Sequence, residues 1–321
     1  MRFTLEYPSE LPTAPDDFLL PEVIRAVSSK AEACGFSAVA LSEHPAPSVK
    51  WHDNGGHNTL DPIAALSFMA AATEDIRLMT NLYVLPYRTP YLSAKALTSV
   101  DIISGGRLIA GVGAGYLRSE FTAVGVEFTD RAAVFDDAIA TLRGIWDDPT
   151  TPRSGPGYTA VGDVWLQRPA QRPHPPLWIG GNSRAALRRV AAHGDGWMPL
   201  IVDRAMATAI RTDAIETADQ FSARLAELHG RIAESGRNPE SVDVQIVCPP
   251  TDLDDRHAVA AAHDLIDDLR DRGATWVVVH VDGSSPAHAL RYIERFAEEF
   301  GLDPTRTEPP STEPVTTERT S

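Results

Sequence analysis

FSAVALSEHP, residues 36–45, gives the clearest indication of the fold. Its first seven residues are apolar or small and show no polar alternation, a pattern typical of a strand that is buried on both faces. A helical pattern ends at Gly35 directly before it, and Glu43 and His44 follow at its end. A strand with two buried faces needs helices on both sides, so this stretch predicts one βα unit of a parallel sheet.

The same unit recurs along the rest of the chain. We expect eight short apolar strands, at residues 2–7, 36–42, 76–85, 105–115, 176–181, 194–199, 242–248 and 275–281. Helical patterns are found at residues 19–35, 61–73, 90–104, 119–146 with a break near Gly125, 183–193, 204–235, 255–272 and 286–300. Eight such units match the size of an α/β protein with one (β/α)8 TIM barrel, which we expect over residues 1–302. An open doubly wound sheet is the alternative.

Two segments stand outside this pattern. Residues 147–176, between the fourth and fifth strands, are rich in Pro, Gly and Arg and predict an insertion with a small hairpin at residues 158–166. Residues 303–321 contain four prolines, six threonines and no aromatic residue, so they predict a disordered Pro/Thr-rich tail.

Composition and charge narrow the class of protein. The 321 residues include 29 Lys and Arg against 44 Asp and Glu, which gives a formal net charge of −15. Such a surface repels phosphate backbones and anionic lipids, which argues against nucleic acid and membrane partners. Cys34 and Cys248 are too few for a disulfide framework, and the chain shows no signal peptide or long apolar run. We therefore expect a cytoplasmic protein.

The residues that follow the strands are the candidates for chemistry, because barrel active sites lie at the carboxyl ends of the strands. His44 is suited to acid–base work, since imidazole titrates near neutral pH, and a buried structural histidine is the alternative. Glu43 would orient it or bind a ligand, although adjacent strand residues point to opposite sides. Arg88 is expected to pair with an acid of a neighbouring loop. His52 and His57 fit no metal-ligand spacing with His44, so no metal site is predicted.

Two glycine-rich turns are candidates for ligand contact. GVGAGY (Gly111–Tyr116) lacks the G-x-G-x-x-G spacing of a dinucleotide fingerprint, and its glycines either leave room for a flat ring or relieve crowding between strands. WIGGNS (Trp178–Ser183) ends a strand in two glycines, after which Asn182 or Ser183 caps a helix. The N–H groups at such a helix start bind anions, and an ordinary capped turn is the alternative.

Four segments in this order resemble the luciferase-like monooxygenase superfamily. They are SEHP (residues 42–45), TNLYVLPYRTPYLSAKAL (80–97), GGRLIAGVGAGYLRSEFTAVGVEF (105–128) and PPLWIGGNSRAALRRVAAHGDGWMP (175–199). Within the superfamily the chain is most similar to actinobacterial deazaflavin-dependent oxidoreductases that use coenzyme F-420. The resemblance covers about residues 1–302.

The resemblance implies a barrel whose cofactor lies across the C-terminal mouth. Glu43 would contact the polar edge of the ring, and His44 would lie near the carbon that carries the hydride. A non-prolyl cis peptide is implied within residues 81–84, at Leu82–Tyr83. The phosphate would bind at the turn after the fifth strand. The implied cofactor contacts are Glu43, Asn81, Leu82, Tyr83, Ala114, Gly115, Gly180, Gly181, Asn182 and Ser183.

Tyr116 is a departure from the family pattern. Relatives that oxidise sugar phosphates carry a carboxylic acid there, so we expect a different, less polar substrate. Tyr116 joins His44 and Glu43 as a candidate catalytic residue, and Trp51 and Trp197 are candidate pocket walls.

The resemblance implies an oxidoreductase that transfers a hydride between coenzyme F-420 and a small organic substrate, with His44 as proton donor or acceptor. A reduced-FMN-dependent monooxygenase and a non-catalytic flavin- or deazaflavin-binding protein are the alternatives. A homodimer is compatible with the family.

Overall fold

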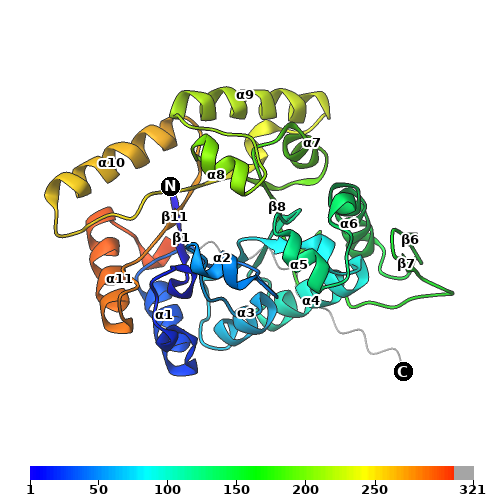
Figure 1. Ribbon diagram of the computed structural model, residues 1–321, viewed down its shortest axis with the longest axis horizontal. Coiled ribbons are helices and arrows are strands. Elements are labelled where there is room, and N and C mark those ends of the chain that lie inside the picture. The colour runs from blue at the N-terminus through cyan, green and yellow to red at the C-terminus, as the bar shows by residue number, and fades with distance from the viewer. Residues whose placement is uncertain (307–321) are drawn as a thin grey trace.

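Eight parallel strands form a closed barrel in the computed structural model, which describes residues 1–306 (Figure 1). They are β1 (Arg2–Glu6), β2 (Ala38–Leu41), β3 (Arg77–Thr80), β5 (Leu108–Gly113), β8 (Leu177–Gly180), β9 (Gly196–Met198), β10 (Asp243–Val247) and β11 (Trp276–Val279). The ring closes through the parallel pairs β1–β11 and β3–β5. The predicted (β/α)8 barrel is therefore confirmed, and the alternative of an open doubly wound sheet is wrong.

Helices surround the barrel in Figure 1. The long ones are α1 (Pro21–Ala33), α3 (Pro62–Ala70), α4 (Pro90–Ile103), α6 (Arg131–Asp147), α7 (Arg184–His193), α9 (Ala218–Glu234), α10 (Arg256–Asp271) and α11 (Pro286–Phe300). Four of them, α1, α3, α4 and α11, begin at a proline, whose fixed φ and missing N–H suit the first helical position. Short helices lie in the connecting loops, namely α2 (Val49–Asp53), α5 (Arg118–Ala123) and α8 (Arg204–Ala209).

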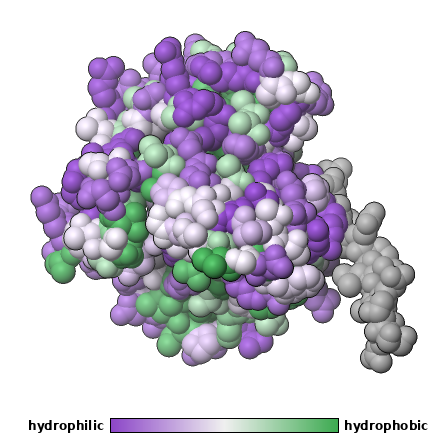
Figure 2. Space-filling view, turned by 90° about the vertical axis from the view of Figure 1, so that its right-hand side faces the viewer, coloured by the Kyte–Doolittle hydropathy of each residue, from purple (hydrophilic) through white to green (hydrophobic). Residues whose placement is uncertain are grey.

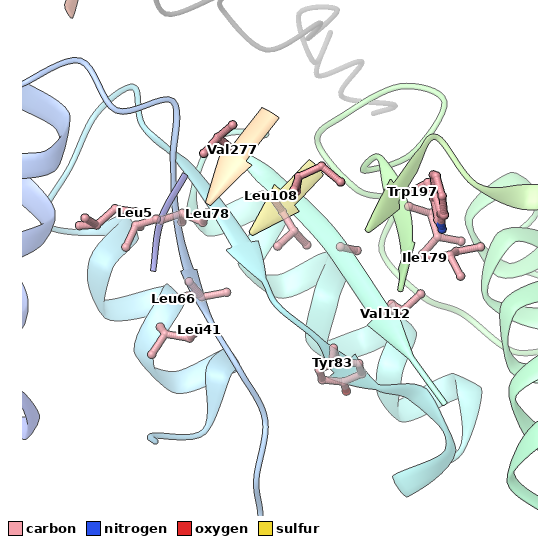
Figure 3. Close-up of a cluster of buried hydrophobic side chains, with 14 of the residues drawn as sticks. Leu5, Leu41, Leu66, Leu78, Tyr83, Leu108, Val112, Ile179, Trp197 and Val277 are labelled. Atoms are coloured by element: carbon pink, nitrogen blue, oxygen red, sulfur yellow. The ribbon is translucent and has the colours of Figure 1, made fainter. Parts of the chain in front are cut away.

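Strand side chains fill two separate layers, because successive residues point to opposite faces. The barrel interior holds Ala38, Ala40, Met79, Ile109, Trp178, Met198 and Trp276. The rings of Trp178 and Trp276 meet edge to face there, with centroids 5.2 Å apart. Leu5, Leu78 and Val277 belong to the layer between strands and helices (Figure 3). The centre of the barrel is thus packed solid.

The third strand is interrupted, although the sequence predicted one strand over residues 76–85. β3 ends at Thr80, and β4 (Tyr83–Val84) follows it beside β5. Leu78 pairs with Leu108 and Tyr83 pairs with Val112, so five residues on this side oppose four on β5. One extra residue of this kind is a β-bulge, and it re-aims the side chains beyond it. The cis peptide joins Asn81 to Leu82, so its predicted position at Leu82–Tyr83 is wrong by one residue.

Two further boundaries differ from the predictions. The hairpin pairs β6 (Ser154–Gly155) with β7 (Tyr158–Thr159) around Pro156 and Gly157, a turn with φ of +76° at the glycine. It begins before the predicted residues 158–166 and overlaps them only at β7. The predicted helix over residues 204–235 is two helices, α8 and α9. Thr217 starts α9 by accepting the Gln220 N–H, and residues 210–217 between them form a loop.

The chain beyond α11 is described only at its start. Residues 303–306 contain the short helix η6 (Pro304–Arg306), and a Cβ on Gly35 would lie 2.8 Å from the carbonyl carbon of Asp303. The rest of the predicted tail, residues 307–321, lies outside the described residues. Hydrophilic residues cover most of the face shown in Figure 2, between smaller apolar patches. Within residues 1–306 no helix is long and apolar enough to span a bilayer.

Candidate active site

A cavity of about 460 Å³ opens at the carboxyl ends of the strands. This is the end of a TIM barrel at which active sites are built, and the volume lies in the range of ligand pockets. Ten of the predicted site residues line it, namely Glu43, His44, Asn81, Leu82, Ala114, Gly115, Tyr116, Gly180, Gly181 and Ser183. Tyr83 and Asn182 do not.

His44 is held by a buried acid that the sequence analysis did not select. Its Nδ1 lies 3.3 Å from Oε1 of Glu120, on α5, and the Glu120 side chain is only 1% exposed. The Tyr87 hydroxyl donates to the other Glu120 oxygen at 2.6 Å. Burial, followed by this bond to Glu120, raises the pKa of Tyr87, so its hydroxyl keeps its proton. Because Glu120 accepts on both oxygens, this contact favours the His44 tautomer with its proton on Nδ1, which leaves Nε2 without a proton.

Aromatic side chains surround the His44 imidazole. The Trp51 ring lies 4.4 Å away between centroids, His57 at 5.3 Å and Tyr116 at 6.1 Å. The Trp51 indole N–H lies 3.3 Å from the Tyr116 hydroxyl and donates to it. Burial, and then the neighbouring His44, lower the pKa of His57. The imidazole of His44 is therefore fixed in orientation by its neighbours as well as by Glu120.

Glu43 has partners of its own, on another side of the strand. One of its carboxylate oxygens accepts the Val84 N–H at 2.6 Å, and its carboxylate forms an ion pair with Arg88. The prediction that Arg88 pairs with an acid of a neighbouring loop is confirmed. Burial raises the pKa of Glu43, although Arg88 and the Val84 N–H act in the opposite direction. Glu43 thereby connects the end of β2 to β4, where the cavity wall turns.

Two of the predicted aromatic contacts belong to the core instead. Tyr83 is buried in the layer outside the barrel (Figure 3). The guanidinium of Arg88 stacks over its ring at 4.4 Å. Trp197 stacks on Phe221 of α9 in the same layer, and its indole N–H donates to the Gly181 carbonyl at 2.9 Å. Trp197 is therefore not a pocket wall, because it points out of the barrel.

The glycines of β5 make room for protein atoms. A Cβ on Gly111 would lie 2.1 Å from the Thr80 carbonyl oxygen, and one on Gly113 would lie 3.0 Å from Leu82 Cδ1. A Cβ on Gly180 of β8 would lie 2.2 Å from Cδ1 of the same Leu82 side chain. The interpretation that these glycines relieve crowding is favoured at Gly111, while Leu82 fills the space beside Gly113 and Gly180.

The predicted anion site lies where β8 meets α7. Gly181 has φ of +110°, which favours glycine, and Ser183 caps α7 by accepting the Ala186 N–H at 3.2 Å. Ser183 lines the cavity, so the first N–H groups of α7, which have no acceptor within the helix, lie at its edge. Arg189, also on α7 and lining the cavity, pairs with Asp136 at 2.6 Å. This arrangement suits a phosphate or carboxylate.

Asn182 is fully buried and holds this turn in place. Its side-chain amide donates to the carbonyl oxygens of Leu200 and Asp213, at 2.8 Å each, and accepts the Leu200 N–H at 2.9 Å. Its own N–H donates to the Thr212 hydroxyl at 2.9 Å. With these atoms engaged within the protein, Asn182 offers a ligand no direct contact and instead connects the turn to the loop after α8.

Glu10 is a second acid that sequence reasoning missed. It lies in the short helix η1 (Pro8–Glu10) after β1, lines the cavity, and has no partner for Oε1. Its Oε2 accepts the Ser42 N–H at 3.1 Å and lies 3.8 Å from His57 Nδ1. Burial, and then the charge of Glu6, raise the pKa of Glu10 to about 7. A carboxyl group in this state gives or takes protons near neutral pH.

The lining of the cavity fits a flat cofactor that ends in a phosphate. Leu82, Val84 and Met198 supply apolar surface, and the start of α7 supplies N–H donors at one side. Glu10 Oε1 and the Ser42 hydroxyl are buried polar atoms at the cavity that have no partner within the described residues. Among residues 1–306 no group of three or more His, Cys, Asp or Glu side chains is placed to hold a metal ion.

Comparison with protein families agrees with this geometry. The luciferase-like monooxygenase family matches residues 20–299. The chain belongs to the luciferase-like monooxygenase family. Members of this family similar to the chain include both FMNH2-dependent monooxygenases and F-420-dependent oxidoreductases.

Two curated relatives represent these two cofactors. The FMNH(2)-dependent dimethylsulfone monooxygenase of Pseudomonas putida is 32% identical over 146 residues, which cover 44% of this chain and 40% of that protein. The F-420-dependent glucose-6-phosphate dehydrogenase of Intrasporangium calvum is 28% identical over 179 residues, which cover 53% and 51%. The chain thus spans about half the length of these relatives or less.

Solved structures share the fold over almost the whole chain. The monooxygenase RslO1 from Streptomyces bottropensis superposes with a TM-score of 0.77 and 21% identity, covering 93% of this chain and 98% of that one. At this identity the likeness concerns the fold alone.

Proposed function

We propose that the chain is an oxidoreductase that transfers a hydride between coenzyme F-420 and a small organic substrate, with His44 as proton donor or acceptor. The observation that carries the proposal is the His44–Glu120 pair at the cavity, whose lining also includes Ser183 at the start of α7. A bound deazaflavin supplies a ring carbon that gives or takes a hydride. The chain's residues must orient the reactants and move one proton.

His44 is the residue placed for that proton. Glu120 fixes the Nδ1 proton, so Nε2 is free to accept a proton from an alcohol or, once protonated, to donate one to a carbonyl oxygen. Glu120 also stabilises the positive charge that His44 carries after accepting a proton. Trp51 and Tyr116 pack beside the imidazole, and the His44 side chain is 9% exposed. Tyr116 offers a hydroxyl in place of an acid, which favours a substrate that is less polar than a sugar phosphate.

The remaining lining residues support the cofactor in this proposal. Ser183 and the first N–H groups of α7 would hold the phosphate, and Leu82 with Val84 would support the ring. A homodimer and a cytoplasmic location stay predictions.

A reduced-FMN-dependent monooxygenase is the second candidate. The dimethylsulfone monooxygenase, at 32% identity, is the observation in its favour, and the same phosphate site and apolar surface would serve FMN. Titration of the pure protein with both cofactors, followed by fluorescence, separates the two. Preferential binding of reduced FMN together with oxygen consumption would overturn the choice of F-420.

Replacing His44 tests its role. We expect His44→Ala to leave the F-420 dissociation constant within a few fold and to lower turnover by about 10²-fold, the scale of a lost general acid or base. Turnover is followed by F-420 absorbance across a panel of ketones, enones and secondary alcohols. His52→Ala, a histidine whose side chain is 54% exposed on the neighbouring loop, is the matched control and should retain activity. Turnover equal to wild type in His44→Ala would remove His44 from the mechanism.

A further inference from the structure

Three arginines surround one phenylalanine, and one of the three, Arg211, lines the cavity. The guanidinium carbons of Arg131, Arg118 and Arg211 lie 4.0, 4.7 and 5.0 Å from the centre of the Phe128 ring. Arg118 is the first residue of α5, Arg131 is the first residue of α6, and Arg211 follows α8. Phe128 itself is buried in the short helix η4 (Phe128–Asp130). The fold therefore gathers three like charges from separate segments, and we call them the arginine cluster.

The arginine cluster forms no ion pair with an acid of residues 1–306. Within residues 1–306 none of the three guanidiniums has a carboxylate oxygen within ion-pair distance, whereas nearby Arg189 and Arg224 both pair with aspartates. Arg131 and Arg211 donate to backbone carbonyls instead, at 3.1 and 3.2 Å. This is notable in a chain whose acids outnumber its basic residues by 44 to 29.

Glu127, an acid whose pKa the charge of Arg118 affects, is already engaged. The Glu127 carboxylate accepts the Thr129 N–H and hydroxyl, both at 3.1 Å. These bonds, with a smaller contribution from the charge of Arg118, lower the pKa of Glu127. Glu127 is fully exposed to water, which screens its charge, so it does not substitute for a bound anion.

The three charges repel one another in the absence of a ligand. Burial, and then the charges of Arg211 and Arg118, lower the pKa of Arg131. Arg211 has φ of +59°, a left-handed conformation that side-chain-bearing residues seldom adopt. An anion between the guanidiniums would replace this repulsion with charge-assisted hydrogen bonds.

One member of the arginine cluster, Arg211, adjoins the predicted anion site at α7. Arg211 and Thr212 both line the cavity, and the Thr212 hydroxyl accepts the Asn182 N–H within the β8–α7 turn. Arg211 Nε also donates to the Tyr116 carbonyl, which places the guanidinium beside the loop after β5.

We propose that Arg118, Arg131 and Arg211 form a second anion-binding site, for phosphate or carboxylate groups on the acidic tail of the cofactor. The assignment to a cofactor tail rests on the proposed function, since F-420 carries carboxylates beyond its phosphate and FMN ends at its phosphate. An anionic substrate is the other source of the same chemistry. The site would give the chain a preference for the longer, more highly charged cofactor.

Binding of three probes to the full chain tests the proposal. They are F-420, a tail-less deazaflavin with the same ring but no phosphate or carboxylate, and inorganic tripolyphosphate. We expect the triple variant Arg118→Gln/Arg131→Gln/Arg211→Gln to weaken F-420 and tripolyphosphate at least tenfold and the tail-less deazaflavin less than twofold. Fluorescence titration measures the deazaflavins and calorimetry measures tripolyphosphate. The F-420 affinity of wild type should also fall more steeply with salt than that of the triple variant.

Two variants separate charge from shape. Arg25→Gln is the matched control, because Arg25 lies over the Phe68 ring at 5.6 Å on α1, away from the cavity, and it should change no affinity by more than twofold. The triple Lys variant retains the charges and should keep F-420 affinity within a few fold of wild type. Thermal unfolding monitored by circular dichroism checks that each variant is folded.

The outcomes distinguish this proposal from the proposed function. Loss of tripolyphosphate binding with unchanged F-420 affinity would support the anion site and assign it to the substrate. If wild type binds no deazaflavin, the proposed function fails. Tripolyphosphate binding by wild type, compared with the triple variant, then decides alone whether the arginine cluster binds anions. Equal weakening of tailed and tail-less deazaflavin, or wild-type tripolyphosphate binding in the triple variant, would overturn the anion site.

Discussion

Glu120 engages both of its carboxylate oxygens inside the protein, one toward His44 and one with the Tyr87 hydroxyl. A carboxylate that is 1% exposed is costly to bury unless both oxygens have hydrogen-bond donors. Its partners satisfy this condition and also determine which nitrogen of His44 faces the cavity. Glu120 is therefore a positioning residue for His44.

Glu120→Gln tests this role with little change of shape. An amide N–H directed at His44 Nδ1 would turn that nitrogen into an acceptor and move the imidazole proton to Nε2. We expect turnover to fall about tenfold to a hundredfold, the pH profile of kcat to shift, and F-420 affinity to stay within a few fold. Steady-state kinetics from pH 5 to 9 measure the turnover and the pH profile of kcat. A lower Tm with an unshifted pH profile would mean that Glu120 is only structural.

Glu10 should make stability depend on pH. Its pKa of about 7 in the folded state is above the ordinary value of 4.5, so between these values the folded chain holds a proton that the unfolded chain has released. The contribution of Glu10 to the free energy of unfolding is therefore fully present below pH 4.5 and is lost as the pH rises toward 7.

Glu10→Gln removes this titration. The unfolding free energy of the variant minus that of wild type should therefore be larger at pH 8 than at pH 5, by about 1–3 kcal/mol. Urea unfolding at the two pH values measures the difference. Glu22→Gln, an exposed acid on α1, should show no comparable change. A stability difference for Glu10→Gln that is the same at both pH values would contradict the assignment.

The residues of the site divide into those that sequence could find and those that it could not. His44 and Glu43 follow an apolar strand, and Arg88 lies between two prolines, so position along the chain indicated them. Glu120 lies on a short helix and Glu10 in a short turn, where acids are usually exposed. Their burial depends on tertiary contacts with Tyr87 and Ser42, which no local pattern contains.

At the scale of elements, the sequence predicted all eight strands of the barrel and missed the interruption of the third one. Apolar runs bounded by glycine and proline gave the strands because burial on two faces leaves a continuous signal. The bulge after Thr80 depends on the register with β5, which apolar composition does not encode. Likewise, helix propensity continues through residues 204–235, but Asn182 binds the Asp213 carbonyl and residues 210–217 form a loop.

Two glycine-to-alanine substitutions in different elements should have opposite effects. A Cβ on Gly111 would lie 2.1 Å from the Thr80 carbonyl oxygen, a backbone atom in the pair of strands that closes the barrel. We expect Gly111→Ala to destabilise the chain by about 3 kcal/mol or more. Gly230, in the middle of α9, has nothing within 4 Å of its Cβ position, so Gly230→Ala should stabilise by about 0.5–1 kcal/mol.

Urea unfolding followed by tryptophan fluorescence measures both variants. Equal effects of the two substitutions would show that helix or strand propensity, rather than the Thr80 contact, decides the outcome at Gly111.

At the scale of the whole molecule, ring closure explains why one chain carries both a packed core and an open site. Pairs β1–β11 and β3–β5 leave none of the eight ring strands unpaired on either side, and bulky side chains such as Trp178 and Trp276 fill the interior. A ligand is therefore confined to the loops at the barrel end. The sequence predicted the eight units, but the partner of each side chain at the mouth required the closed ring.

The net charge of −15 should also act on the molecule as a whole. Repulsion among unbalanced carboxylates favours the expanded chain, and salt screens it, whereas salt weakens exposed ion pairs by only about 0–1 kcal/mol each. Because many exposed acids lack a basic partner in so acidic a chain, we expect repulsion to dominate at pH 7.5. Raising NaCl from 0.02 to 0.5 M should then stabilise the fold by about 1 kcal/mol, or roughly 2–4 °C in Tm. At pH 5.0, which equals the sequence pI, this stabilisation by NaCl should disappear. A salt-induced gain of equal size at both pH values would indicate a general salting-out effect in place of relieved repulsion.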